Sequence, residues 1–385
     1  DWTHPNLVAN AARVAKKPVL LFSELNPKRA GLIGLLASAG TLDQLGVKNF
    51  RIWGKIGNSE DLRKILTHVR VAAAINKLKN SVLGIFGGLS MGMYTAASDA
   101  SQIRHIFGIE TKHFDQLRIV QEAEKVKEDA VKRAVEWLER HVKKIDFDEK
   151  RLTREILERQ VRCYYAVKNI VMNEKVDFVA IKCHPELSEG YCTQCLVHAF
   201  MNDPYDWDGR KKIIPTACEA DIDGAITMEI LHLLSGEPVL FSDIRHYSPK
   251  DNLFIVVNCG AHPTYFSNAS QNPEENLKDI SLLPQIFSAG GASLNFLCKP
   301  GEITIARLGR RRGKYVMHVI KGEFTKQTVE GDIPLGWPKG IIKLHGDAEA
   351  FLTSIESNHI HAVYGDFVNE LVKLSKALSI DVEVF

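Results

Sequence analysis

Compact apolar runs and amphipathic stretches take turns along the first 235 residues. The runs of strand length lie at residues 18–22, 50–53, 81–86 and 177–181. Apolar side chains recur at helical spacing over residues 6–16, 31–39, 60–78, 114–142 and 151–171. Strands that alternate with helices predict a parallel, doubly wound sheet.

The pattern changes beyond Asp243. Residues 254–258 form another apolar run, and residues 302–308 and 314–320 alternate apolar and polar side chains at period two. A basic turn at residues 309–313 joins the last two, which predicts an antiparallel, β-rich region. We therefore expect an α/β protein in which Rossmann-like doubly wound domains precede a β-rich C-terminal domain. The expected domains are residues 1–79, 80–235 and 236–385.

Two carboxylates follow two short apolar runs near the middle of the chain. Glu219 comes directly after residues 213–218, and Asp243 comes directly after residues 238–242. Apolar residues at helical spacing between them predict a helix that returns the chain alongside the first strand. Both carboxylates then lie near neighbouring strand ends, where open α/β sheets bind ligands.

Carboxylates held close together repel each other unless they share a proton or a cation. A divalent metal would remove this repulsion, so the sequence favours a metal site at Glu219 and Asp243. The alternative is that both residues are helix caps or solvated loop acids.

Two other strand ends carry candidate ligand contacts. Lys182 and His184 follow the strand predicted at residues 177–181, whose end should face the same cleft as Glu219. Each is a candidate contact, with an incidental position at the strand end as the alternative. The turn at residues 87–94 is glycine-rich, but its spacing fits neither a dinucleotide-binding loop nor a P-loop. Close packing of the glycines is the simpler interpretation, with a site for a sugar hydroxyl as the alternative.

Composition narrows the class of protein. The chain has 385 residues, enough for two or three domains, and it is 45% hydrophobic and 25% charged, as is typical of soluble globular proteins. A net charge of +2 gives no basis for binding nucleic acid or a membrane surface, and no apolar run reaches transmembrane length. The seven cysteines are typical of reduced intracellular thiols. We therefore expect a cytoplasmic protein without nucleic-acid or membrane partners.

Four short motifs together resemble the L-fucose isomerase family, within the fucose/arabinose isomerase group. They are residues 217–221 (ACEAD), 241–245 (FSDIR), 89–92 (LSMG) and the pair Asn358–His359, which stands just before Tyr364–Gly365. The similarity covers most of the chain.

The resemblance implies a metal-dependent aldose–ketose isomerase that uses Mn²⁺, although another divalent metal also suits the residue types. Glu219, Asp243 and His359 match the family's metal ligands. His361 is the alternative to His359, which we prefer because its distance to the Tyr-Gly pair fits the family. Asn358 matches a substrate contact.

Further family features concern the pocket and its assembly. Trp2 resembles a tryptophan that, in the family, enters the pocket of a neighbouring subunit, and the resemblance implies a homo-oligomer, a hexamer, with pockets shared between subunits. Trp337 resembles an aromatic substrate contact. The first half of the family's N-terminal α/β domain is expected to be missing, along with a sugar-contacting arginine. Close relatives have a glutamine where this chain has Lys182, Cys183 and His184, and a cation there favours a sugar with an anionic substituent.

The expected reaction moves a proton from C2 of an aldose to C1 through a cis-enediol. We expect Glu219 and Asp243 to act on opposite sides of it, one as base at carbon and the other on the hydroxyl proton. A fucose- or arabinose-type sugar is the expected substrate. The alternatives are an isomerase of an acidic hexose such as a sulfosugar, or a non-catalytic sugar-binding protein.

Overall fold

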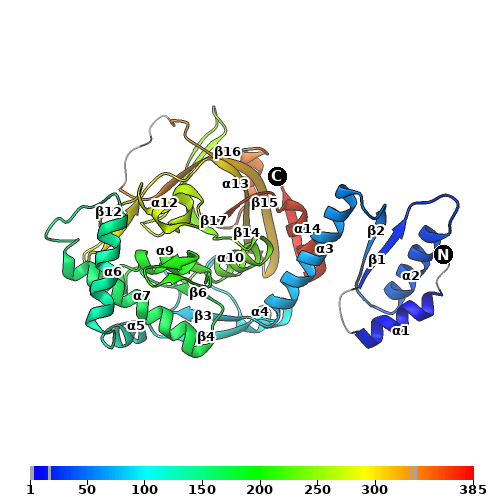
Figure 1. The fold of residues 1–385 in the computed structure, drawn as a ribbon, viewed down its shortest axis with the longest axis horizontal. Helices are drawn as coiled ribbons and strands as arrows, with labels where there is room; N and C mark the ends of the chain where they lie inside the picture. The colour runs from blue at the N-terminus through cyan, green and yellow to red at the C-terminus, as the bar shows by residue number, and fades with distance from the viewer. Residues whose placement is uncertain (1–3, 16–18, 330–331, 333–335) are drawn as a thin grey trace. The chain divides into compact units, whose positions relative to one another are not determined.

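The computed structural model describes residues 4–15, 19–329, 332 and 336–385, and these fall into two compact units (Figure 1). The smaller unit contains residues 1–76 and 369–379, and the larger contains residues 77–368 and 380–385. The expected boundary after residue 79 lies close to the first division of the chain. The expected boundary after residue 235 falls inside the larger unit. Trp2 lies outside the described residues.

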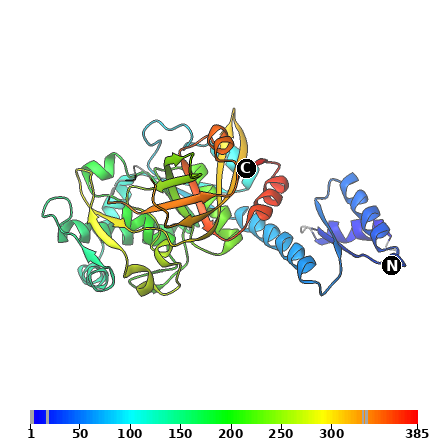
Figure 2. The ribbon, with the colours of Figure 1, turned by 90° about the horizontal axis from the view of Figure 1, so that it is seen from above.

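The smaller unit, mostly blue in Figure 2, is built on two parallel strands. β1 (Val19–Glu24) pairs with β2 (Asn49–Gly54), and α1 (Pro5–Ala15), α2 (Gly31–Gln44) and most of α3 (Ser59–Leu78) belong to the same unit. Most of α14 (Val368–Leu378) also belongs to it, and Glu370 of α14 accepts a hydrogen bond from Thr67 of α3 at 2.9 Å. Its apolar core includes Ala9, Ala12 and Leu42.

The larger unit begins with a parallel sheet in the order β4-β3-β6-β9. Its strands are β3 (Val82–Phe86), β4 (Glu110–Phe114), β6 (Phe178–Ile181) and β9 (Thr216–Cys218). The connecting helices are α4 (Ala100–Phe107), α5 (Gln116–Ala123), α6 (Glu128–His141), α7 (Arg154–Glu174), α8 (Glu186–Gly190) and α9 (Cys195–Asn202). Every residue of β6 and β9 is buried, which explains why these strands are uniformly apolar or small.

The remainder of the larger unit is dominated by a closed antiparallel barrel. The ring runs β14-β17-β10-β11-β16-β15 and closes where β15 pairs with β14. Its strands are β10 (Leu240–Ser248), β11 (Leu253–Val257), β14 (Gly301–Arg311), β15 (Lys314–Thr325), β16 (Lys339–Leu344) and β17 (His359–Tyr364). β18 (Asp381–Val384) adds to β15 in parallel. Because the ring is closed, each of its strands pairs with a neighbouring strand on both sides.

Shorter elements complete the unit. The strands are β5 (Lys144–Ile145), β7 (Tyr205–Asp206), β8 (Gly209–Arg210), β12 (Ser281–Pro284) and β13 (Ala292–Asn295), and the helices are α11 (Tyr265–Asn268), α12 (Pro273–Leu277) and α13 (Ala348–Ser354). No helix in the described residues is both long enough and apolar enough to cross a membrane.

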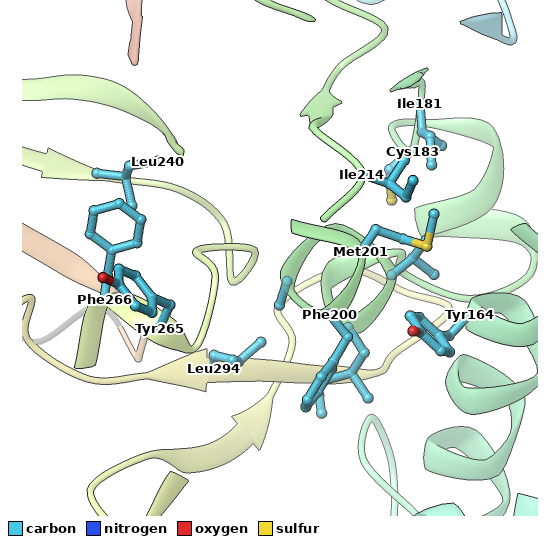
Figure 3. Close-up of a cluster of buried hydrophobic side chains, with 14 of the residues drawn as sticks. Tyr164, Ile181, Cys183, Phe200, Met201, Ile214, Leu240, Tyr265, Phe266 and Leu294 are labelled. Carbon is cyan, nitrogen blue, oxygen red and sulfur yellow. The ribbon is translucent and has the colours of Figure 1, made fainter. Parts of the chain in front are cut away.

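One helix connects the two sheets of the larger unit. α10 (Ile222–Ser235) packs on β6 and β9 of the parallel sheet and on β14 and β17 of the barrel, and residues 222–231 are all buried. A single apolar core continues from one sheet to the other; Figure 3 shows part of it, with Ile181 of β6, Met201 of α9 and Leu240 of β10. This packing fixes the end of β9 against the barrel.

The α/β prediction is confirmed, with two local corrections. The stretch at residues 114–142 is not one helix, because it ends β4 and then forms α5 and α6 with a break at residues 124–127. The strands before Glu219 and at Asp243 are not neighbours in one sheet: β9 ends the parallel sheet and β10 belongs to the barrel. The helix between them packs on both sheets, so the two carboxylates still approach each other.

Glu229 of α10 provides a prediction about stability. Its side chain is buried, and one carboxylate oxygen has no hydrogen-bond partner among the described residues. Burial raises the pKa of Glu229 to about 8, and the charge of Asp177 adds to the rise. In the unfolded chain the pKa of this carboxyl is near 4.5. Between pH 4.5 and pH 8 the native state therefore binds a proton that the unfolded chain does not. Stability contributed by this group therefore falls as the pH rises from about 4.5 to 8.

We expect Glu229→Gln to remove this pH dependence and to raise the free energy of unfolding at pH 7 by about 3 kcal/mol. Urea unfolding of both proteins at pH 5 and pH 7.5 measures the effect. Equal pH dependence in the two proteins would contradict the assignment.

Candidate active site

Glu219 is displayed by a tight turn between β9 and α10. Glu219 and Ala220 both have left-handed backbones, with φ of 58° and 50°. This conformation is unfavourable for residues with a Cβ and is concentrated at functional sites. The turn is held by a hydrogen bond from Asp221 N to Cys218 O at 3.0 Å, and Asp221 then caps α10 by accepting from Gly224 N.

Asp243 and His359 are directly opposite each other in the barrel. β10 and β17 are antiparallel, and their register pairs Asp243 with His359. Directly paired side chains on antiparallel strands lie on the same face of the sheet. The register alone therefore brings an acid and an imidazole together from positions 116 residues apart.

His359 joins the two sheets at the site. Its Nε2 lies 3.1 Å from Glu219 Oε2 and 3.5 Å from Asp243 Oδ1. The His359 side chain is 1% exposed, against 15% for Glu219 and 29% for Asp243. Asn358 also belongs here, since its Nδ2 donates to Asp243 Oδ1 at 2.7 Å.

A buried ion pair lies directly behind His359. Asp221 Oδ2 lies 2.7 Å from His359 Nδ1, and the same carboxylate receives two hydrogen bonds from the Arg307 guanidinium. Both Asp221 and Arg307 are fully buried. A Cβ at Gly224 would lie 2.6 Å from Asp221 Oδ2 and 3.0 Å from Arg307 Nη1, so the glycine provides the space for this pair. Asp221 thereby orients the ring so that Nε2 faces Glu219 and Asp243.

Charge is unevenly distributed around the imidazole. Burial raises the pKa of Asp221, but Arg307 and His359 outweigh it and hold that pKa well below its ordinary range. Burial also lowers the pKa of His359, but its hydrogen bond with Asp221 and the nearby carboxylate of Glu219 prevail and raise that pKa to about 10. Burial raises the pKa of Asp243 to about 6, with His359 opposing the rise and Glu219 adding to it. The carboxylates therefore favour a positive charge at this point.

Glu219 also borders a cavity of about 170 Å³ in the larger unit. The cavity is lined by thiols, by apolar side chains and by His184, Thr193, Gln194 and His198. The thiols are Cys183, Cys195, Cys218 and Cys259, and all four are free. A concave, mostly apolar space beside convergent polar groups is the usual form of a small-molecule site.

Comparisons with known proteins agree with this geometry. Residues 1–80 match a family model described as the first N-terminal domain of L-fucose isomerase, and residues 256–385 match its C-terminal domain. The two matches together cover more than half of the chain. The chain belongs to the L-fucose isomerase family. The predictions of this family and of an isomerase are both confirmed.

Relatives within the family carry two names. A sulfoquinovose isomerase of Priestia megaterium is 24% identical over 390 residues, covering 96% of this chain and 80% of that protein. An L-fucose isomerase of Haemophilus influenzae is 22% identical over 443 residues, covering 92% of this chain and 74% of that protein. An L-fucose isomerase of Phocaeicola vulgatus is 25% identical, covering 74% of this chain and 61% of that protein.

The structure of this family member groups some of the predicted site residues and separates others. Glu219, Asp243, His359 and Asn358 come together, and His184 lines the adjoining cavity. His361 is also buried, but its Nε2 faces Arg307 at 3.3 Å.

Lys182 is not a lone cation, because its Nζ lies 2.6 Å from Glu186 Oε1. Trp337 packs with Leu253, Ile255 and Ile341 in a separate apolar cluster. Neither residue belongs to the lining of the cavity beside Glu219 within the described structure.

The donors at His359 fit a divalent cation. Glu219 Oε2 and His359 Nε2 are both buried without a hydrogen-bond partner in the described part of the chain. Adjacent ligands of an octahedral cation, each about 2.1 Å from it, lie about 3 Å apart, and the separations of 3.1 and 3.5 Å are of this size.

As they stand, no three His, Cys, Asp or Glu side chains of the described residues form a complete metal site. Glu219 Oε2 and His359 Nε2 nevertheless lie 3.1 Å apart without hydrogen-bond partners among the described residues, and a cation between them would satisfy both atoms.

Sequence reasoning missed Asp221 and Arg307. Asp221 gave a weak signal, because it stands directly before the predicted helix and reads as an N-cap. Arg307 is a stronger indication of a buried polar site. It is a charged residue within Ile303–Leu308, a run whose other residues are typical of a buried strand. Such an arginine needs a buried acid, but the sequence does not say which.

Proposed function

We propose that this member of the L-fucose isomerase family is a divalent-metal-dependent aldose–ketose isomerase. The observation that carries the proposal is the meeting of Glu219, Asp243 and His359 at one buried imidazole nitrogen. The cation would be held by these three side chains, and Mn²⁺ suits two carboxylates and an imidazole. When bound, it would polarise adjacent sugar oxygens as a Lewis acid. A non-catalytic sugar binder has no need of such a set.

Glu219 and Asp243 supply the proton transfers in this proposal. They come from different sheets, β9 and β10, and both approach the face of His359 that carries Nε2. One carboxylate removes the proton at C2 and returns it at C1, and the other moves the proton between the hydroxyl oxygens of the cis-enediol. Asn358 holds Asp243 Oδ1 by its hydrogen bond, which keeps the other oxygen available.

The substrate is proposed to be a fucose- or arabinose-type sugar. A sulfosugar is the second candidate, because relatives named sulfoquinovose isomerase align over 96% of this chain. Lys182 is less able to attract an anionic substituent of the sugar, because its charge is paired with Glu186. Ketose formation from L-fucose, D-arabinose, L-arabinose and sulfoquinovose, with Mn²⁺ and after chelation, tests the proposal and chooses between the candidates. Failure to convert any of them in protein that contains metal would contradict this substrate assignment.

A cytoplasmic homo-oligomer, a hexamer with shared pockets, is also proposed. The family resemblance supports it through Trp2, and light scattering of the purified protein measures its mass directly. A monomer that turns over sugar at full rate would exclude a shared pocket.

The proposed metal site predicts a pH dependence of binding. With its pKa near 10, His359 carries a proton at neutral pH, and a cation must displace that proton. We expect Mn²⁺ affinity to rise about tenfold per pH unit from pH 6.5 to 8.5. Isothermal titration in buffers of different ionisation enthalpy measures both the affinity and the proton released. Affinity that is independent of pH over this range would exclude His359 as a ligand.

A further inference from the structure

The smaller unit contains a cavity of about 440 Å³ that is formed entirely by its own residues. It lies where β2, α3 and α14 meet, and apart from His68 the charged residues of its lining are Arg51, Arg63, Lys64, Lys373 and Glu60. A volume of this size is typical of a small-molecule site. Four cationic side chains against one acid indicate that an occupant would be an anion.

The three elements bring these side chains to one place. Arg51 and Trp53 lie two residues apart on β2 and therefore on the same face of the strand. Residues that lie three and four apart share one face of a helix. On α3 the lining residues with this spacing are Glu60, Arg63, Lys64, Thr67 and His68, and on α14 they are Asn369 and Lys373.

Contacts between the elements hold α14 in position beside the cavity. Thr67 of α3 donates to Glu370 Oε1 of α14 at 2.9 Å, and Arg70 Nη1 lies 3.2 Å from the same oxygen. Lys48, just before β2, donates to Ala377 O at 2.6 Å. The walls of the cavity are therefore connected to one another by side-chain contacts.

Two of the four cations have no partner. Arg63 and Lys373 have neither an acid nor a hydrogen-bond partner in the described part of the chain. The other two are paired, Lys64 with Glu60 at 3.3 Å and Arg51 with Asp43. Because the single acid of the lining is already paired, the charges of Arg63 and Lys373 are available to a ligand.

His68 adds no charge to this balance. Its Nδ1 lies 2.8 Å from Lys64 O, and burial lowers the pKa of its ring, with the charge of Lys373 adding to the fall. An adjoining cavity of about 420 Å³ shares Lys373 and adds Lys48 and Lys376. Positive charge therefore extends past Lys373 on α14.

We infer that this cavity binds a phosphate monoester of a small organic molecule, with the phosphate at Arg63 and Lys373 and the organic part against Trp53. A phosphate monoester carries close to two negative charges at neutral pH, which matches two unpaired cations, whereas a carboxylate or sulfonate carries one. The planar donors of arginine bind phosphate oxygens in pairs. Trp53 is 49% exposed and offers an aromatic face to a sugar or base.

The inference does not depend on the isomerase proposal. Glu219, Asp243 and His359 belong to the larger unit, and none of them lines this cavity. Binding can therefore be measured without turnover, in protein treated with a chelator so that the proposed metal site is empty.

Titration calorimetry of the full chain with glucose 6-phosphate, glucuronate and glucose tests the charge of the ligand. The three probes share a pyranose ring and differ at C6. AMP serves as a second phosphate monoester, and inorganic phosphate serves as the anion alone. We expect glucose 6-phosphate or AMP to bind at least about tenfold more tightly than glucuronate, and glucose not to bind. Affinity for the phosphate ester should fall as salt is added, because the cations are partly exposed.

Substitutions locate the binding. Arg63→Gln and Lys373→Gln should each weaken the phosphate ester about tenfold. Trp53→Ala should weaken AMP and leave inorganic phosphate unchanged. Arg133→Gln and Lys132→Gln are matched controls, because both remove an exposed cation of α6 in the larger unit, and both should bind as wild type does. Thermal unfolding should show that all variants fold.

Three results would overturn the inference. The first is a wild type that binds none of glucose 6-phosphate, AMP and inorganic phosphate up to millimolar concentrations. The second is wild-type affinity for the phosphate ester in folded Arg63→Gln and Lys373→Gln proteins. The third is glucuronate that binds as tightly as glucose 6-phosphate and AMP, which would exclude recognition of a dianion. None of these results bears on aldose turnover, so the two proposals stand or fall separately.

Discussion

The Glu219→Gln protein is expected to lose at least about 10³-fold in kcat while it remains folded. The substitution keeps the shape of the side chain but removes the charge that faces His359 Nε2 at 3.1 Å. A neutral amide is no base for the proton at C2, and it is a poorer ligand for a cation. Ketose formation and solvent deuterium incorporated at C1 of the ketose measure the loss of the base, and Mn²⁺ titration measures the loss of the ligand.

Glu229→Gln is the matched control for this prediction. Glu229 is also a buried glutamate of the larger unit, but it lies on α10 outside the lining of the Glu219 cavity in the described structure. It should keep the wild-type kcat. A Glu219→Gln protein with more than about a tenth of the wild-type kcat would rule out Glu219 as the base.

Asp221→Asn is expected to damage both stability and metal binding. The change leaves the Arg307 guanidinium fully buried without its acid, which should cost about 3–5 kcal/mol of the free energy of unfolding. It also removes the acceptor that orients His359, so Mn²⁺ affinity should fall about 10- to 100-fold. Urea unfolding and Mn²⁺ titration measure the two effects separately.

Asp223→Asn provides the comparison, two residues along the same helix. Asp223 pairs with Arg310, whose side chain is 20% exposed, and it makes no contact with His359 among the described interactions. We expect a smaller loss of stability and unchanged Mn²⁺ affinity. Equal Mn²⁺ affinity in the two variants would show that Asp221 does not position the metal ligand.

The local hydrophobic pattern predicted the positions of Glu219 and Asp243, because each follows a run of residues typical of a strand. Glu219 stands directly after one apolar run and Asp243 directly after another, so both positions could be predicted from the sequence. The way in which they meet could not be predicted from this pattern, because local spacing does not show that the two strands belong to different sheets. The structure brings them together through α10, which packs on both sheets, and through the register of β10 with β17.

The pairing of Arg307 with Asp221 behind His359 could not be predicted from hydrophobic periodicity. Arg307 and Asp221 lie 86 residues apart, and their pairing depends on the packing of β14 against α10.

The break between α5 and α6 shows the limit of helical spacing as a guide. Residues 114–142 keep an amphipathic pattern throughout, yet the chain turns at residues 124–127. Both helices bury their own apolar side chains, Ile119 and Ala123 on α5 and Val131, Ala134, Val135 and Leu138 on α6. The same periodic pattern therefore serves two helices, and tertiary packing decides where the first one ends.

Titration of chelator-treated protein with Mn²⁺, followed by electron paramagnetic resonance, tests the metal site most directly. We expect one tightly bound Mn²⁺ per chain in wild type, and loss of that binding in Asp243→Asn and in His359→Leu. His318→Leu should retain it, because His318 is buried on β15 beside Glu356 and Glu383. Binding that survives in both site variants, or a wild type that binds no Mn²⁺, Zn²⁺, Fe²⁺ or Mg²⁺, would contradict a metal site at Glu219, Asp243 and His359.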